Sequence, residues 1–385
     1  MSASAYRTLR AGSARRLLDS PRDRFDWALF LVTAALAVVG VVNLYSATSV
    51  VRASLSDLYV QQVYWLVAGG ILAALAAAID YRWIERYGYA IYGFGVVLLL
   101  LVFVLGRDIR GSSRWIQIGS FSLQPSEFMK IFLIVALAKY LHNDPKTEGR
   151  KLRDLVVPAA FAALPVILVL RQPDLGTALI LLLIFASIGA LMRIQRRSLA
   201  WLAGTSIVGG WVSWQYLLKP YQKQRITSFL NPEANLLGAN WHAHHARVAI
   251  GAGRIFGEGF MRGTQNQFLF LPDQYTDFPF PVFAEDWGFV GSLVLVGLYA
   301  FLILWGIRVA QSARDRFGAV LAIGVSALLF WHVFFNLGMV TGMLPVVGVT
   351  LPLFSYGGSS VMTVMIGLGL LMNVSVRRHQ IAPRI

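Results

Sequence analysis

The chain has 385 residues, of which 57% are hydrophobic and only 14% are charged. A soluble domain is about half apolar and a quarter charged, so this composition excludes an ordinary soluble protein and indicates a polytopic membrane protein. The net charge is +15, but the basic residues mark loops, as orientation signals do, rather than a nucleic-acid site. Cysteine is absent, which excludes disulfides and thiolate metal sites.

Long apolar runs dominate the sequence, and about 20 such residues are needed to cross a bilayer. We expect an all-α polytopic membrane protein with about ten transmembrane helices and long extracytoplasmic loops. Residues 1–26 lack the apolar core of a cleavable signal, so they are expected to form a basic cytoplasmic tail before the membrane domain, 27–376, and a second tail, 377–385. The expected spans are 27–47, 60–80, 87–106, 126–142, 155–171, 174–193, 198–217, 284–307, 318–340 and 358–376.

The distribution of basic residues predicts the orientation. With ten spans, both termini lie on the same side of the membrane. The tails and the alternate loops on that side hold 21 of the 34 lysines and arginines. The positive-inside rule therefore places both termini in the cytoplasm and the protein in the cytoplasmic (inner) membrane.

Three loops on the outer side are long, namely residues 107–125, 218–283 and 341–357. The middle one is too long for a plain connection, and such loops usually carry function. Within it, residues 234–256 are expected to form an amphipathic helix on the outer surface, followed by a glycine-rich turn. No strand precedes these glycines, so they are not a dinucleotide-binding fingerprint.

Asp277 stands near the end of the middle outer loop, in the stretch YTDFPF. The position suits a turn or a helix-capping residue. It also suits a general base in a cleft at the membrane surface, because Phe278 and Phe280 would desolvate the carboxylate. Glu285 follows at the start of the next expected span, where the helix dipole alone favours an acid in the first turn.

Ionisable residues within spans are costly and usually face the interior or a wet cavity. Glu127 and Lys130 are spaced i, i+3 at the start of the fourth span, so they can pair, either as a structural pair or to hold a cavity's polar groups. Asp174 ends the turn RQPD and can cap the next helix. Arg114 lies in a basic, aromatic outer loop, which suits an anionic head group or an interfacial anchor.

Two further stretches carry polar side chains of interest. In LPLFSYGGSSVM, the glycines let the backbone approach a ligand, Ser355 and Ser359 are candidate helix caps, and a helix N-terminus favours phosphate. The stretch HAHH, residues 242–245, could bind a metal, but no acid or cysteine stands at helical spacing nearby.

Taken together, these stretches resemble the SEDS family (shape, elongation, division and sporulation), the polytopic peptidoglycan polymerases typified by RodA and FtsW. The resemblance covers about residues 27–378, and the order and spacing of the motifs fit. The stretch AED, residues 284–286, is closer to the AEE typical of the RodA branch than to the GEE typical of FtsW. This resemblance favours the RodA branch, which serves cell elongation. The motifs are SSRWIQIG, FSLQPSEFMK, RQPDLGTA, YQKQRITSFLNPEAN, GTQNQFLFLPDQYTDF, FAEDWGFVGS and TGMLPVVGVTLPLFSYGGSS.

The resemblance implies a glycosyltransferase that uses lipid II on the outer face of the cytoplasmic membrane. By motif, Asp277 matches the essential aspartate of the family's TDF motif, and Glu127 and Lys130 match its QPSE-x-x-K pair. Asp174 matches its QPDLGT aspartate, and Arg225 falls in its YQ-x-x-RI segment. The resemblance also implies a class B penicillin-binding protein as partner, and it makes Mg²⁺ or Mn²⁺ a candidate cofactor.

The chain departs from the family pattern at a few positions. His245 stands where the family has glutamine, Arg254 where it has glycine, and Pro279 turns TDFIF into TDFPF. Asp286 lies in AEDWG, where the family has AEELG. These changes leave the reaction class alone and bear on the shape of the outer cavity.

The expected reaction joins two sugars by attack of an acceptor hydroxyl, the GlcNAc 4-OH, on the anomeric carbon of MurNAc. A single base, Asp277, would remove the acceptor proton, and attack from the opposite face would invert the anomeric centre. The departing diphosphate gathers negative charge, so cations should face it, and the candidates are Lys130, Arg114 and Arg225.

Three other functions stay open on the residues alone. A lipid II flippase would use the same cavity and basic loops but needs no base. A noncatalytic scaffold for the penicillin-binding protein would tolerate the loss of Asp277. An ion-coupled transporter predicts ionisable residues near the midplane of several spans, whereas most acids here lie near span ends.

Overall fold

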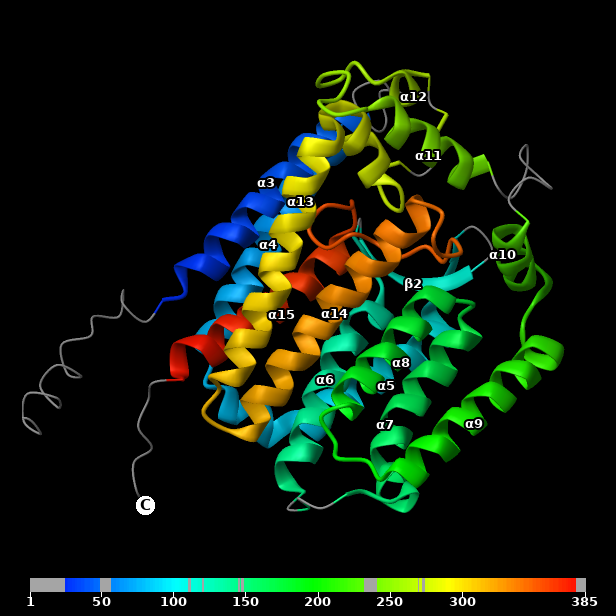
Figure 1. Cartoon of the computed structure of the whole chain (residues 1–385). Helices are drawn as coiled ribbons and strands as arrows, with labels where there is room; N and C mark the ends of the chain where they lie inside the picture. The colour runs from blue at the N-terminus through cyan, green and yellow to red at the C-terminus, as the bar shows by residue number, and fades with distance from the viewer. Residues whose placement is uncertain are drawn as a thin grey trace, which may run out of the picture.

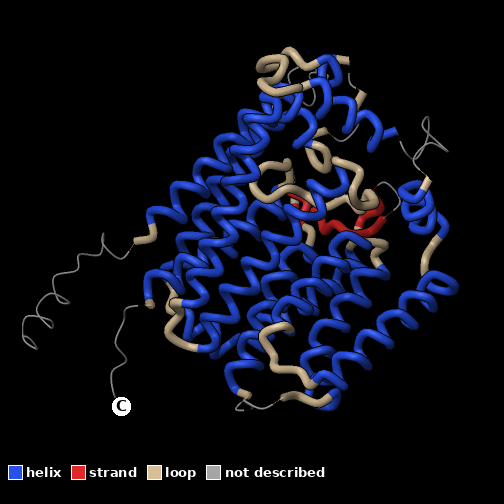
Figure 2. Tube along the Cα trace, in the orientation of Figure 1, coloured by secondary structure: helices blue, strands red, loops and turns tan. Residues whose placement is uncertain are grey.

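The computed structural model is a bundle of helices standing side by side, with strands only in one small outer sheet among the residues described (Figures 1 and 2). The described residues are 25–48, 57–109, 112–119, 121–144, 146, 149–231, 241–268, 270–271 and 274–378.

A helix occupies each of the ten expected spans. Seven of these helices are long and apolar enough to cross a membrane. The other three are α6, which carries charged residues, and α8 and α9, which have 15 and 17 residues. The expected class, an all-α polytopic membrane protein, is confirmed. The helices are α3 (Trp27–Thr48), α4 (Leu58–Ala78), α5 (Tyr81–Leu105), α6 (Pro125–Asn143), α7 (Leu152–Arg171), α8 (Leu175–Gly189), α9 (Arg196–Val212), α13 (Pro279–Gln311), α14 (Arg316–Val340) and α15 (Gly358–Arg377).

The centre of the bundle is formed by α6, α14 and α15. In α14 and α15, 72% and 78% of the most apolar stretch is buried, against 11% in α4. A helix at the periphery of the bundle, such as α4, keeps apolar side chains on its exposed surface, as expected for a helix that faces lipid. The polar residues of α6 and α14 are therefore enclosed by protein.

The two ends of the described chain meet at one end of the bundle. Asp26, just before α3, accepts a hydrogen bond from Oγ of Ser375 near the end of α15 (2.6 Å). It also accepts one from Nε1 of Trp305 in α13 (2.9 Å). This buried carboxylate joins three helices, and it places the start of α3 and the end of α15 on the same side, as ten spans require.

The first long outer loop contains a three-stranded antiparallel sheet, where the sequence analysis expected only a loop. Its strands are β1 (Arg107–Ile109), β2 (Ser112–Ile118) and β3 (Phe121–Leu123), in the order β1-β2-β3. Gly119, with φ of +62°, supports the tight turn between β2 and β3. The sheet leads directly into Pro125, the first residue of α6, where proline is favoured.

The middle outer loop contains three short helices, α10 (Pro220–Leu230), α11 (Trp241–Ala252) and α12 (Thr264–Gln267), after a π-helical turn, Ser213–Leu217. The helix expected at 234–256 is present as α11 over residues 241–252, so it ends four residues earlier than expected, and residues 232–240 lie outside the described part. The glycine-rich turn is also present, with φ of +83° at Gly257.

Helix α13 is broken at Gly288, where φ is +65° and ψ is −162°. The glycine-rich turn docks into this break: the Phe289 amide donates to the Arg254 carbonyl (2.9 Å), and the Val290 amide to that of Ile255 (3.1 Å). A methyl group on Gly288 would lie 2.3 Å from the Gly257 nitrogen, so glycine alone fits here. The break sets the direction of residues 279–287, the segment that follows Asp277.

Candidate active site

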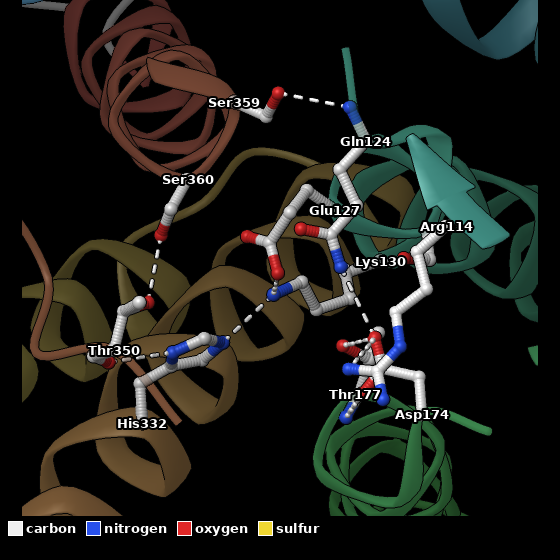
Figure 3. Close-up of polar contacts among 11 residues, drawn as sticks. Arg114, Gln124, Glu127, Lys130, Asp174, Thr177, His332, Thr350, Ser359 and Ser360 are labelled. Atoms are coloured by element: carbon white, nitrogen blue, oxygen red, sulfur yellow. Dashed lines mark hydrogen bonds and ion pairs between the residues drawn. The ribbon is translucent and has the colours of Figure 1, made fainter. Parts of the chain in front are cut away.

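The expected pair of Glu127 and Lys130 forms. Nζ of Lys130 donates to Oε1 of Glu127 at 2.9 Å, and both residues are buried in the first turns of α6 (Figure 3). A buried lysine requires a charged or polar partner, because desolvation of an unpaired ammonium is costly. The two residues therefore form a buried ion pair near the start of a central helix.

A second acceptor for Lys130 comes from His332 in α14, a residue that the sequence analysis missed. Nζ of Lys130 lies 2.9 Å from Nε2 of His332, and Nδ1 of His332 lies 3.0 Å from the carbonyl oxygen of Thr350. The hydroxyl of Thr350 in turn bonds that of Ser360 (2.8 Å). This chain of contacts joins α6, α14, α15 and the 341–357 loop (Figure 3).

Asp174 caps α8, as expected from its place in RQPD. Its Oδ1 accepts from the backbone amide of Thr177 (3.1 Å), and its Oδ2 accepts from the Thr177 hydroxyl (3.0 Å). Oδ2 also accepts from Nε2 of Gln124, the residue just before α6 (3.1 Å). The Asp174 carboxylate therefore both caps α8 and joins α8 to the start of α6.

Arg114, on β2, lies beside this carboxylate. Its Nη1 is 3.8 Å from Oδ2 of Asp174, its Nε donates to the carbonyl of Gln172 (3.1 Å), and Nη2 donates to that of Pro173. Its side chain stays 29% exposed. The guanidinium fastens the outer sheet to the turn between α7 and α8 and keeps part of its surface accessible to an anion.

Asp277, near the end of the middle outer loop, is half-buried and lies beside the 341–357 loop. Nδ2 of Asn336, in α14, donates to the backbone carbonyls of Asp277 (3.0 Å) and Val349 (2.7 Å). A methyl group on Gly348 would lie 3.2 Å from Oδ2 of Asp277. The backbone of this segment is fixed by α14, and its carboxylate lies against the 341–357 loop.

Tyr356, at the far end of the 341–357 loop, adds a further tie to the Asp277 segment. Its backbone amide donates to the carbonyl of Tyr275 (2.8 Å), and its hydroxyl donates to Oε1 of Gln61 (2.7 Å). Burial raises the pKa of the Tyr356 phenol, so this donor stays protonated.

One face of α14 carries two residues, His332 and Asn336, that contact the Lys130 and Asp277 parts of the candidate site. His332 and Asn336 are four residues apart, so they lie on the same face, about 6 Å apart along the axis. They bind the consecutive carbonyls of Thr350 and Val349. The backbone of Asp277, through Asn336, and the ammonium of Lys130, through His332, are thus both attached to this face.

Neither Ser355 nor Ser359 caps α15, contrary to the expectation. The N-cap residue is Gly357, and no side chain bonds the first turn. Oγ of Ser355 accepts instead from the amide of Leu351 (2.8 Å), inside its own loop. Oγ of Ser359 accepts from the amide of Gln124 (3.0 Å), so it joins the start of α15 to the end of the outer sheet.

Glu285 was expected in the first turn of its helix, but it lies beyond that turn. Helix α13 begins six residues earlier, at Pro279. The carboxylate is fully buried and accepts from the amides of Gln265 (2.9 Å) and Asn266 (3.3 Å). The hydroxyl of Thr264 also reaches it, at 3.4 Å. Glu285 therefore organises α12 and the middle outer loop.

Arg225 is exposed on α10, at the edge of the bundle in Figure 1. The structure does not bring it to the charged residues at the ends of α6 and α8. If it serves the reaction, it does so through a part of the substrate that extends to this edge.

Comparison with known proteins identifies the family. Residues 26–380 match the FtsW/RodA/SpoVE family model, described as Cell cycle protein. The chain belongs to this family. Peptidoglycan glycosyltransferase MrdB of Escherichia coli (strain K12) is 34% identical over 374 residues, which cover 95% of this chain and 99% of MrdB. Peptidoglycan glycosyltransferase RodA of Treponema pallidum is 33% identical and covers 92% of this chain and 98% of its own length.

Solved structures agree with this assignment to the FtsW/RodA/SpoVE family. One, described as "Structural coordination of polymerization and crosslinking by a peptidoglycan synthase complex", matches with a TM-score of 0.78 and 34% identity. It covers 92% of this chain and 99% of the matched chain. The rod shape determining protein RodA of Thermus thermophilus matches with a TM-score of 0.69 and 31% identity, over 92% of this chain and 98% of its own. The expected SEDS membership and polytopic fold are confirmed.

Two departures from the FtsW/RodA/SpoVE pattern have a structural reason. His245 stacks on Phe270, with ring centroids 5.3 Å apart, and its Nδ1 lies 3.0 Å from Oε1 of Gln265. It thus packs against the end of the middle outer loop. Pro279 is the first residue of α13, a position in which its missing N–H has no cost.

Proposed function

We propose that this chain polymerises lipid II into glycan strands on the outer face of the cytoplasmic membrane. Its membership of a family that includes peptidoglycan glycosyltransferases supports the reaction class. The observation that carries the mechanism is the attachment of Asp277 and Lys130 to one face of α14. The same helix thus fixes the backbone that carries the Asp277 carboxylate and the ammonium of Lys130, and these two groups can serve the two charged ends of one transfer.

Asp277 is the general base in this proposal. It takes the proton from the 4-OH of the acceptor GlcNAc as that oxygen bonds the anomeric carbon of the donor MurNAc. The bond from this carbon to the lipid-linked diphosphate breaks at the same time, and undecaprenyl diphosphate leaves. Attack from the opposite face inverts the α-linked donor to a β-linked product with no covalent intermediate.

Lys130 is the first candidate to face the leaving diphosphate. An ammonium has three N–H donors, and the described residues use two of them, through Glu127 and His332. Arg114 is the second candidate because its guanidinium is partly exposed beside Asp174. Arg225, on the exposed α10, is the third and would act on a more distant part of the substrate.

A divalent cation, Mg²⁺ or Mn²⁺, is part of the proposal. Among the described residues, no group of three or more histidine, aspartate and glutamate side chains could hold a metal ion alone. Mg²⁺ commonly takes one or two carboxylates and completes its ligands with substrate phosphates. Oε2 of Glu127 fits that arrangement, because it is buried and accepts no hydrogen bond from the described residues. A bound cation would supply charge stabilisation to the diphosphate.

The setting of the reaction follows from the same family. One matched structure is described as a complex that coordinates polymerization and crosslinking, which supports a class B penicillin-binding protein as partner. The basic tails and loops support cytoplasmic termini and an outward-facing Asp277. The similarity to MrdB and RodA supports a role in cell elongation and rod shape.

The test is glycan polymerisation from lipid II by the purified protein with its cognate penicillin-binding protein. A β-lactam blocks crosslinking, and wild type is compared with Asp277→Ala and the isosteric Asp277→Asn. We expect strands from wild type alone, with complex formation equal in all samples. Strands from either variant at the wild-type rate would disprove the role of Asp277. No strands from any sample, with lipid II still crossing vesicle membranes, would favour a flippase.

A further inference from the structure

His332 is a buried histidine for which the proposed reaction has no direct use. It lies in the central helix α14, is 2% exposed, and both of its ring nitrogens have a partner. Nδ1 lies 3.0 Å from the carbonyl oxygen of Thr350, and Nε2 lies 2.9 Å from Nζ of Lys130. Buried ring nitrogens need partners, and here one of the two partners is a charged side chain of another helix.

The two partners fix the proton on the His332 ring. A carbonyl oxygen can only accept, so the proton must be on Nδ1 to bond Thr350. A lysine ammonium can only donate, so Nε2 must keep its lone pair. The neutral ring with the proton on Nδ1 is the one form that satisfies both contacts. An imidazolium would instead place a second cation against Lys130 in a buried site.

The same contacts fix the ammonium of Lys130. Lysine has a flexible four-carbon stem, so a single partner would leave Nζ several positions. Glu127 holds it from within α6 and His332 holds it from α14, each at 2.9 Å. With two N–H groups engaged, the direction of the third is determined.

We infer that His332 is a positioning residue, which holds Lys130 with one N–H directed at the diphosphate of the substrate. It also ties Lys130 to Thr350, two residues along the 341–357 loop from Gly348, which lies against Asp277. The role of Lys130 at the diphosphate rests on the proposed function. The ring's proton position and its contact with Lys130 do not.

The contact is tested first without an activity measurement. The full-length protein in its complex is labelled with ¹⁵N-histidine, and the spectrum of His332→Gln identifies the His332 signals among the six histidines. We expect a protonated Nδ1 and an unprotonated Nε2, and we expect the Nε2 resonance to shift in Lys130→Met. A proton on Nε2, an imidazolium, or a resonance unchanged in Lys130→Met would overturn the inference.

The consequence for the reaction is tested with two variants. His332→Phe keeps the ring volume but loses both contacts, and we expect turnover to fall about 10- to 100-fold with little change in KM, the effect of a misplaced group. His332→Gln can still accept from Lys130 and should stay within about threefold of wild type. Ser326→Ala is the matched control, because Ser326 is also buried in α14 but bonds only its own helix.

The outcomes separate the two proposals. If His332→Phe folds, binds the partner and polymerises as wild type does, the positioning role is wrong. If His332→Phe does not fold, two other results decide whether His332 positions Lys130. They are the turnover of His332→Gln, expected within about threefold of wild type, and the shift of the Nε2 resonance in Lys130→Met. If wild type makes no glycan, the proposed function fails while the spectroscopic result stands by itself.

Discussion

The carboxylate of Asp277 lies against the backbone of Gly348, so closely that a side chain on this residue would crowd it. A methyl group on Gly348 would lie 3.2 Å from Oδ2 of Asp277. Gly348 also has φ of +74°, a conformation that favours glycine. The glycine therefore serves both the turn of the 341–357 loop and the close approach of the proposed base.

We predict that Gly348→Ala reduces polymerisation much more than it reduces stability. The left-handed backbone costs an alanine about 1–2 kcal/mol. The added methyl group would also crowd the Asp277 carboxylate and shift it by a few tenths of an ångström. Such a shift should slow the reaction, since a 1 Å displacement can cost about 100-fold in rate. Initial rates of glycan synthesis and the Tm of the complex, measured together, check this.

Gly119→Ala is the matched control for that prediction. Gly119 has a similar φ of +62°, but no atom lies within 4 Å of the position a methyl group would take. It should lose similar stability and keep its polymerisation rate. Equal losses of rate in both variants would mean that backbone strain, rather than the contact with Asp277, is responsible.

Asp174 is predicted to matter more as a hydrogen-bond acceptor than as a charge. Asp174→Ala removes the cap of α8, which costs about 1 kcal/mol, together with the contact to Gln124. Asp174→Asn keeps one oxygen for the Thr177 amide, but its NH2 group replaces Oδ2, which accepts from Gln124, and the charge opposite Arg114, 3.8 Å away, is lost. Thermal unfolding should therefore show a larger fall in Tm for the alanine variant than for the asparagine variant. An asparagine variant as unstable as alanine would show that the contacts and charge of Oδ2 dominate over the cap.

Glu285 is predicted to stabilise the middle outer loop. Glu285→Ala leaves the buried amides of Gln265 and Asn266 without an acceptor, at a cost of about 2 kcal/mol or more. Limited proteolysis of the loop should then be about 30-fold faster, since cleavage follows the population of the open form. The exposed Glu258, in the same loop, gives a control variant, Glu258→Ala, which should be cleaved at the wild-type rate. Identical cleavage of all three proteins would refute this role.

Removal of divalent cations is predicted to slow polymerisation. With EDTA, the developing charge on the diphosphate would be met by Lys130 and Arg114 alone, and Mg²⁺ or Mn²⁺ should restore the rate. Glu127→Gln should show a weaker response to added cation, because Oε2 of Glu127 is the proposed protein ligand. A rate unaffected by EDTA would remove the cation from the proposal.

Much of the fold could be predicted because the spans are marked by long apolar runs. Even α6 was found, since its charges lie at its ends and leave the apolar run intact. The outer sheet was missed because β1 and β3 have only three residues each, too few for an alternating pattern. The break in α13 was also missed, because apolar residues continue on both sides of Gly288 and other glycines, such as Gly297, lie in unbroken helix.

The site could be predicted only in part. Glu127 and Lys130 were found because charge inside a span is rare, and the same rule could have found His332 and Asn336, two polar residues four apart in an apolar helix. The place of Asp277 in the sequence fits a helix cap equally well, so its proposed role came from the family motif. The serine contacts were predicted wrongly, because Ser355 bonds the amide of Leu351 within its own loop, and Ser359 bonds the amide of Gln124, which only the tertiary structure brings near.

The break in α13 has a consequence for how the protein is assembled. A straight helix of 33 residues would be about 50 Å long, well beyond the roughly 30 Å of a bilayer's apolar layer. The amides of Phe289 and Val290 and the carbonyl of Glu285, near the break, find their partners in the glycine-rich turn. Insertion of the spans alone therefore leaves these backbone groups without those partners and leaves residues 279–287 without a fixed direction. On the proposed function, the newly made protein would become active only after the glycine-rich turn has docked into the break.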